Sequence, residues 1–364
     1  MSDTPPEPRK SSGQDFESSL SSSDTNVASF ERRHRGVMDT VQHILHLNPT
    51  LVPVMVLVAS VLIFSLPMVT EGKFLTMFNL SLVMQQVSII GILAAAQSLI
   101  ILTAGIDLSV GALMIFSAVI MGLTGVNLGL PSGIALILGF IVSIGGGLMN
   151  GLFVTRVKLP PFIVTLGTWY IFLSILRLLT GSQSIRSQDL DASAPFLKIF
   201  GSFISIGSAR ITFGVILMIL VFAVLWYMLN KTAWGRHVYA IGDDKEAAEL
   251  AGIKTDRMLL SVYMMAGLVV GIAAWASIGR VGSISPNAFA EANLQSITAV
   301  VIGGISLFGG RGSILGPLFG ALIVGVFESG LRLAGLDVQW QVFAIGWLII
   351  LAVAIDQWIR KVSA

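Results

Sequence analysis

The sequence predicts an all-α membrane protein, a polytopic bundle of about ten transmembrane helices with both termini in the cytoplasm. Hydrophobic residues make up 54% of the 364 residues, charged residues only 12%, and the mean hydropathy is +0.86. This leaves too little polar surface for a water-soluble globule, so lipid is the expected solvent. The 38 glycines agree with this, because small residues let helices approach closely inside a bilayer.

The N-terminal segment differs from the rest of the chain. Residues 1–36 are rich in Ser, Pro, Asp and Glu, which predicts a disordered cytoplasmic tail. No apolar stretch follows the early charges until about Leu51, so the segment does not resemble a signal peptide, and the first crossing is expected to be retained. We therefore place the transmembrane domain at residues 37–364.

Ten apolar runs follow, bounded by charges, Gly/Pro clusters or polar loops. Each run is able to form a helix that satisfies its own backbone hydrogen bonds in lipid. Only short glycine-rich breaks separate the second run from the third and the eighth from the ninth. The runs are 51–69, 84–103, 109–125, 132–154, 161–180, 211–230, 259–279, 294–308, 313–331 and 339–358.

The distribution of Lys and Arg predicts the orientation. Arg9 and Lys10 lie too far from a span to count, and Arg177 lies inside one. With the N terminus in the cytoplasm, thirteen of the remaining residues fall inside and six outside, which favours both termini inside and an even number of crossings. Two connections are long enough for structure of their own: an extracytoplasmic loop at 181–210 and a cytoplasmic loop at 231–258.

The cytoplasmic loop at 231–258 contains signals for a short helix. Asp243 is positioned to cap it with Glu246 three residues on, and Gly252 supplies a left-handed stop, giving a helix of about two turns. Its small or apolar face is formed by Ala247, Leu250 and Ala251, and its polar residues are Asp244, Lys245 and Glu249.

Such a helix is too short and too polar to span a membrane, and its small residues between charges suit docking into a groove on another protein. The alternative is a solvated loop helix with ordinary caps. The spacing of Glu246, Ala247, Ala248 and Gly252 resembles the EAA-type motif of bacterial ABC importer permeases, whose helix couples to the ATP-binding subunit.

Further stretches resemble the ribose, xylose and fructose branch of bacterial ABC sugar permeases. The stretches are LTAGIDLSVGALM (102–114), GGLMNGLFVTRVKLPPFIVTLGT (146–168), TAWGRHVYAIGDDKEAAELAGI (232–253), AVVIGGISLFGGRGSILGPLFGALIVG (299–325) and AIDQWIRK near the C terminus. Together with these stretches, the similarity covers nearly all of the chain after residue 40. The nearest likeness within the branch is to fructose permeases.

This resemblance implies a multi-pass protein of the bacterial inner membrane that translocates a monosaccharide. It also implies three partners: a second permease copy in a homodimer, an extracytoplasmic sugar-binding protein, and a cytoplasmic ATP-binding subunit. The chain itself is expected to be a transport subunit and not an enzyme, because no GxxxxGK[ST] sequence is present. No catalytic residue, cofactor or metal site is expected, since the chain has no cysteine and no histidine pair at metal-ligand spacing.

The alternative function is an ion-coupled secondary transporter of a small polar solute. Such a protein needs an ionisable relay near the bilayer midplane, whereas the charges here cluster at the ends of the predicted spans. It also has no need of the cytoplasmic helix.

Two buried polar positions are candidates for the translocation pathway. Asp107, in the GIDLSVG turn, either caps the following helix with help from Ser109 or marks a broken helix that lines a substrate cavity. Asn150 follows a run of glycines and favours hydrogen bonding between helices. Neutral sugars are held by amides, hydroxyls and aromatic faces, which adds further candidates in or beside the spans: Gln97, Thr165, Trp169 and Gln295.

Overall fold

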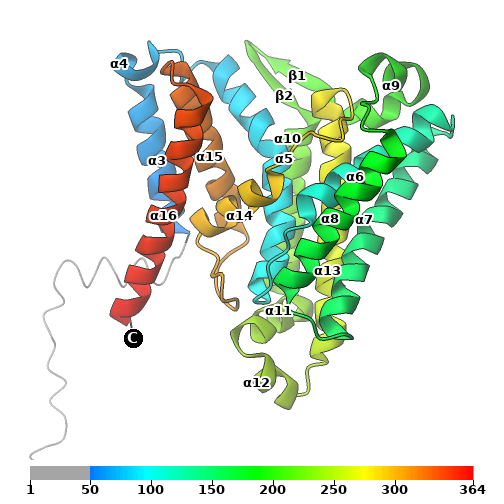
Figure 1. Ribbon diagram of the computed structural model, residues 1–364. Coiled ribbons are helices and arrows are strands. Elements are labelled where there is room, and N and C mark those ends of the chain that lie inside the picture. The colour runs from blue at the N-terminus through cyan, green and yellow to red at the C-terminus, as the bar shows by residue number, and fades with distance from the viewer. Residues whose placement is uncertain (1–49, 364) are drawn as a thin grey trace, which may run out of the picture. The chain divides into compact units, whose positions relative to one another are not determined.

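The computed structural model describes residues 50–363, so the predicted tail at 1–36 lies outside the described residues. One short antiparallel hairpin, β1 (Phe203–Ile206) with β2 (Ala209–Thr212), accompanies the helices (Figure 1). The helices are α3 (Leu51–Ser65), α4 (Pro67–Thr70), α5 (Met77–Leu102), α6 (Val110–Gly122) with a π-helical turn (Leu123–Asn127), α7 (Ser132–Thr155), α8 (Pro161–Thr180), α9 (Ser187–Ser193), a 3-10 helix (Pro195–Gly201), α10 (Phe213–Lys231), α11 (Ala233–Asp243), α12 (Lys245–Leu250), α13 (Thr255–Val281), α14 (Ala292–Ile302), α15 (Leu315–Leu333) and α16 (Val338–Ser363).

The predicted all-α, multi-span class is confirmed. In the described part of the chain, seven helices are long and apolar enough to cross a membrane: α5, α6 with its π-helical turn, α7, α8, α10, α13 and α15. The helices α3 and α14 are apolar but shorter. Each of the ten predicted runs overlaps one of these nine helices or α16.

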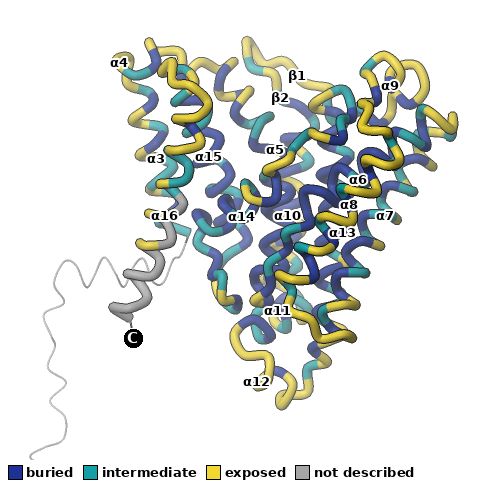
Figure 2. The backbone as a smooth tube through the Cα atoms, in the orientation of Figure 1, coloured by how far each residue is buried: buried dark blue, intermediate teal, exposed yellow. Residues whose placement is uncertain are grey.

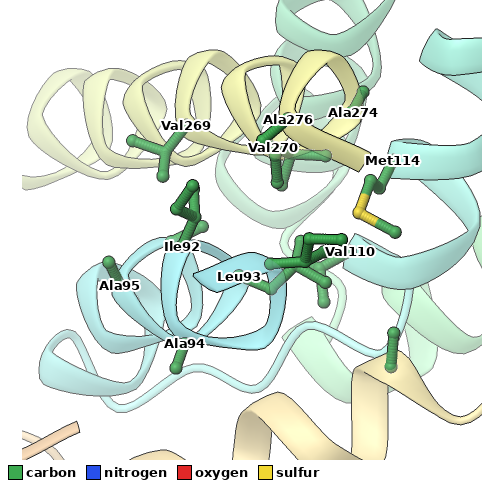
Figure 3. Packing of buried hydrophobic residues seen from close by; sticks show 14 of the residues in the cluster. Ile92, Leu93, Ala94, Ala95, Val110, Met114, Val269, Val270, Ala274 and Ala276 are labelled. Carbon is green, nitrogen blue, oxygen red and sulfur yellow. The ribbon is translucent and has the colours of Figure 1, made fainter. Parts of the chain in front are cut away.

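The helix α5 is the centre of the packing. It is buried along most of its length and contacts α10, α13, α14 and α15 (Figure 2). Figure 3 shows the core side chains at close range: Ile92 of α5 faces Val269 of α13, and Leu93 of α5 lies beside Val110 of α6. By contrast, only 28% of the most apolar stretch of α7, and likewise of α8, is buried, as expected for helices that meet lipid.

The close packing of α7 against α13 depends on glycine. A methyl group on Gly147 would lie 2.3 Å from the backbone oxygen of Tyr263, and one on Gly267 would lie 2.5 Å from the backbone oxygen of Ser143. The backbones therefore touch directly, which is how helices gain van der Waals contact in a solvent as apolar as their own side chains.

The first predicted run, 51–69, is not one helix. Because Pro67 has no N–H and disfavours a helical conformation at the residue before it, Leu66 is extended (φ −63°, ψ 127°) and α3 ends at Ser65. The short helix α4 then begins at the proline.

The two long connections lie at opposite ends of the helices (Figure 1). The first carries α9 and the β1–β2 hairpin, at what we call the hairpin end. The second carries α11 and α12, at what we call the α12 end. Because α13 already begins at Thr255, the second connection spans 232–254, somewhat less than the predicted 231–258.

The eighth predicted run, 294–308, is also shorter than expected. Helix α14 ends at Ile302, since Gly303 and Gly304 follow and Gly304 takes a left-handed conformation (φ +80°). Residues 303–314, which we call the re-entrant loop, then run to the α12 end before α15 begins (Figure 1). In consequence α14 covers about half the thickness of a bilayer.

Candidate functional site

A break in the helices between α5 and α6 is the main polar feature of the interior. Seven residues, 103–109, separate the end of α5 at Leu102 from the start of α6 at Val110. Ala104 has a positive φ of 60°, which is uncommon for a residue other than glycine and indicates that surrounding contacts hold the backbone in this conformation. Buried non-helical backbone must find its hydrogen bonds inside the protein. The side chains around this break supply them.

Asp107, Ser109 and Asn150 form the centre of this network. The Asp107 carboxylate is 3% exposed, and its Oδ1 accepts hydrogen bonds from the Ser109 N–H (2.7 Å) and the Ser109 hydroxyl (2.6 Å). From α7, the Asn150 side-chain amide donates to Ser109 Oγ (2.9 Å) and, at longer range, to Asp107 Oδ2 (3.4 Å). Asp107 thus binds the residue that precedes α6 instead of capping the first helical amides, and Asn150 does bond between helices as predicted.

Gln97 and Thr165 hold the backbone of the break from two other helices. In the amide orientation that pairs both groups, the Gln97 nitrogen donates to the Asp107 carbonyl (3.0 Å) and its oxygen accepts from the Asp107 N–H (3.1 Å). The Thr165 hydroxyl, on α8, accepts from Leu108 N–H and donates to the Ile106 carbonyl, both at 3.1 Å. Both side chains are fully buried.

Sequence reasoning missed two residues of this site. Asn293 of α14 donates its side-chain amide to the Leu108 carbonyl (3.2 Å), and the hydroxyl of Tyr263 on α13 lies beside Gly105. The only sequence signals were a polar residue inside the seventh apolar run, Tyr263, and one immediately before the eighth, Asn293. Among the described residues, neither the Tyr263 hydroxyl nor the Asn150 Oδ1 has a hydrogen-bond partner. These are therefore the polar atoms of the network still free to bind a hydroxyl or a water.

The structure does not bring the other two pathway candidates into this network. Trp169 of α8 is partly buried and packs against the exposed Tyr170, with ring centroids 5.2 Å apart. Gln295 lies in the first turn of α14, also partly buried, with no side-chain hydrogen bond to the described residues.

A second polar group lies nearer the hairpin end, where charged residues of α13 and α15 meet α5. The Gln86 side chain of α5 donates to the Glu328 carboxylate of α15. Arg280 and Arg332 are close enough to act on the Glu328 charge. The Glu328 carboxylate, within a membrane-length helix, is thus hydrogen-bonded to a side chain of a neighbouring helix.

The short helix at the α12 end forms as predicted but begins one residue later. Asp243 is the last residue of α11, and Asp244 is the N-cap of α12, accepting from the Ala247 N–H (2.9 Å). The predicted Asp243–Glu246 capping box is therefore wrong. It fails because Asp243 continues the preceding helix, whereas Asp244 has the extended backbone that an N-cap requires. Gly252 has the predicted left-handed conformation (φ +87°).

The predicted small or apolar face of α12 and its polar residues are all exposed, and Ala248 alone is buried. Ala248 is buried against Ile241 and Leu259, which fixes α12 to α11 and α13. Glu249 accepts a hydrogen bond from Thr255 in the first turn of α13. The other side is open, and its residues Glu246, Ala247, Ala251 and Leu250 are exposed, the last at 90%. Leu250 is one of several large apolar side chains exposed outside the membrane-length helices, as are Met68 and Phe308.

Comparison with known proteins places the chain among permeases. A family model described as "Branched-chain amino acid transport system / permease component" matches residues 79–353. The fructose import permease protein of Rhizobium meliloti is 55% identical over 351 residues, covering 96% of this chain and 97% of that protein.

Two further relatives are more distant. The ribose import permease protein of Bacillus subtilis is 37% identical over 81% of this chain and 89% of its own length. The galactose/methyl galactoside import permease protein of Escherichia coli is 31% identical over 83% and 92%. No solved structure matches.

Proposed function

The chain belongs to the family of branched-chain amino acid transport system permease components, and we propose that within it the chain is the membrane-spanning permease subunit of an ATP-driven monosaccharide importer. Membership confirms the resemblance predicted from five stretches of sequence. The observation that carries the proposal is full-length similarity to import permeases combined with an exposed, capped helix at one end of the membrane helices.

The solute we propose is a monosaccharide, with fructose first. The three relatives described above are named for fructose, ribose and galactose or its methyl glycoside, although the family description names branched-chain amino acids. The fructose permease shares 55% of its residues with this chain over almost the full length of both, against 37% for the ribose permease.

The protein is a multi-pass protein of the bacterial inner membrane. Our proposal for its topology is ten crossings, made by the seven membrane-length helices together with α3, α16, and α14 with the segments on either side of it. The α12 end is then cytoplasmic, and both termini are cytoplasmic as well. The excess of Lys and Arg on that side of the predicted spans supports this orientation.

The proposed partners follow from the two ends. A cytoplasmic ATP-binding subunit docks on the exposed face of α12, around Leu250. An extracytoplasmic sugar-binding protein delivers the sugar at the hairpin end. A second copy of the chain completes the pathway. The chain acts as the transport subunit and binds no cofactor, and ATP hydrolysis resides on the partner.

We propose that the network at the α5–α6 break borders the sugar pathway. Its buried amides and hydroxyls are the groups that neutral sugars bind, and Tyr263 and Asn150 each keep one atom unpaired. Trp169 and Gln295 stay proposed contacts elsewhere along the route, with the Gln86–Glu328 pair nearer the hairpin end.

Reconstitution tests this function. The chain is purified with its co-assembling ATPase and binding protein, placed in liposomes, and supplied with single monosaccharides. We expect fructose-loaded binding protein to stimulate ATP turnover more than ribose, allose or galactose does, and labelled fructose to accumulate only with ATP.

The alternative function predicts a different result. If no ATPase co-purifies and uptake follows an imposed proton or sodium gradient, the chain is a secondary transporter. Stimulation by a branched-chain amino acid and by no sugar would overturn the proposed solute while leaving the ATP-driven mechanism intact.

A further inference from the structure

Three segments far apart in the sequence meet backbone to backbone at the α12 end. They are the end of α5 at Leu102, the end of α11 at Gly242, and the re-entrant loop at Gly309 and Gly310; we call these four residues the glycine junction. The Gly310 N–H donates to the Leu102 carbonyl (3.0 Å). A methyl group on Gly242 would lie 1.8 Å from the Leu102 carbonyl oxygen and 2.5 Å from the Gly310 nitrogen.

The loop side of the junction is equally tight. Gly310 has a φ of +68°, and a methyl group there would lie 2.6 Å from the Asp243 Cα. One on Gly309 would lie 2.7 Å from both the Gly242 oxygen and the Ala104 nitrogen. The junction thus leaves no room for a side chain on any of its three glycines, and it reaches the first residues of the α5–α6 break.

A side-chain bond reinforces the contact between α11 and the re-entrant loop. The Tyr239 hydroxyl of α11 donates to the Gly312 carbonyl (2.9 Å). Burial raises the pKa of Tyr239 above its ordinary value, so the phenol stays protonated and donating at physiological pH. Nearby, Arg311 and Asp243 are 4.0 Å apart but both exposed, so this ion pair adds little.

The re-entrant loop is joined to α14 and α15 by equally close packing. A methyl group on Gly316 would lie 1.9 Å from the Gly303 oxygen, and one on Gly320 would lie 1.9 Å from the Ala299 oxygen. The loop therefore connects two helices whose backbones are already in contact. At the other end of α14, Asn293 binds the Leu108 carbonyl in the break.

These contacts form a continuous path from the cytoplasmic helices to the buried network. We propose that the glycine junction transmits the movement of α11 and α12 to α14 and to the α5–α6 break, so that docking of the ATPase and opening of the sugar pathway are coupled through it. The inference rests on the proposed function. It assigns the coupling to Gly242, Gly309, Gly310 and Tyr239, which lie outside the α12 docking face.

The test compares two glycine-to-alanine variants in the full complex. Gly242→Ala pushes the three segments apart, whereas Gly145→Ala, the matched control, adds a methyl group to an exposed position of α7 with nothing within 4 Å. We expect Gly242→Ala to retain its ATPase but to transport about tenfold less sugar per ATP hydrolysed. Gly145→Ala is expected to match the unmodified chain. Equal sugar-to-ATP ratios in the two variants would overturn the proposal.

A reporter on α14 separates transmission from simple loss of packing. Since the chain contains no cysteine, Leu294→Cys introduces a single thiol on an exposed position of α14. Trapping the complex with ATP and vanadate should change the alkylation rate of that thiol, and Gly242→Ala should abolish the change. A change that persists in the Gly242→Ala background would count against the junction.

If Gly242→Ala does not reach the membrane, the sugar-to-ATP ratio of Tyr239→Phe tests the proposal instead, because this variant removes only the hydroxyl bound to Gly312. A sugar-to-ATP ratio lowered by about threefold or more supports the junction, and a ratio equal to that of Gly145→Ala overturns it. Failure of the proposed function looks different, since then no ATPase co-purifies with the unmodified chain.

Discussion

Asp107→Ala is expected to lower the free energy of unfolding by about 2–4 kcal/mol and to abolish measurable uptake. The Ser109 N–H and hydroxyl lose their acceptor, and Asn150 loses one of its two, in a site that bulk water does not reach. Each orphaned buried donor costs about 1–3 kcal/mol. The thermal unfolding midpoint of the purified chain, followed by fluorescence of its seven tryptophans, measures the loss.

Asp107→Asn then distinguishes the two roles that the sequence left open for this residue. The new side-chain oxygen is able to accept both Ser109 donors, and Asn150 keeps its hydrogen bond to the Ser109 hydroxyl. We expect most of the thermal stability to return. If Asp107 only holds the break together, uptake returns with it. If the carboxylate contacts the sugar or carries a needed charge, uptake stays low in a stable protein.

The network itself is contradicted by one clear result. An Asp107→Ala variant as stable as the unmodified chain would mean that Ser109 and Asn150 do not depend on the carboxylate. In that case the hydrogen bonds at 2.6 and 2.7 Å carry no net stability, and the break is held by Gln97, Thr165 and Asn293.

The hydrophobicity of the sequence predicted that the chain is a membrane protein. It says much less about the candidate site, which lies where an apolar run is interrupted. Two boundaries had only glycine-rich breaks to mark them, those between the second and third runs and between the eighth and ninth. These are the Asp107 break and the re-entrant loop. Glycine signals an interruption but not which distant backbone comes against it. The contact between Gly242 and Gly310 thus could not be predicted, because neither residue has a side chain to indicate a partner.

Local chemistry predicted parts of α12 well and other parts poorly, for identifiable reasons. Gly252 as the left-handed stop followed from its lack of a side chain, and the structure agrees. To choose between Asp243 and Asp244 as the N-cap, one must know where α11 ends. The sequence of the loop contains no signal that marks this end. Asn293 was missed because its partner is a backbone atom far along the chain, and Tyr263 because its hydroxyl has no hydrogen-bond partner among the described residues.

Leu250→Asp is expected to weaken binding of the ATPase by about 10- to 100-fold, or about 1.4–2.8 kcal/mol, and to abolish ATP-driven uptake. Leu250 is 90% exposed, so in the isolated chain it contributes little to the packing of α12. The thermal midpoint of the permease should therefore stay unchanged. Titration of labelled ATPase against the variant in nanodiscs measures the dissociation constant directly.

Leu128→Asp is the matched control, because Leu128 is 70% exposed and follows the π-helical turn that contacts α9 at the hairpin end. It adds the same charge on the side away from the proposed ATPase and should leave binding unchanged. Leu250→Ala separates apolar contact from charge: an apolar groove predicts a moderate loss with Ala and a larger one with Asp. If both Leu250 variants bind the ATPase normally, α12 is the solvated loop helix of the alternative hypothesis. The exposed leucine would then need another partner, and the ATP-driven mechanism would lose its proposed contact at the α12 end.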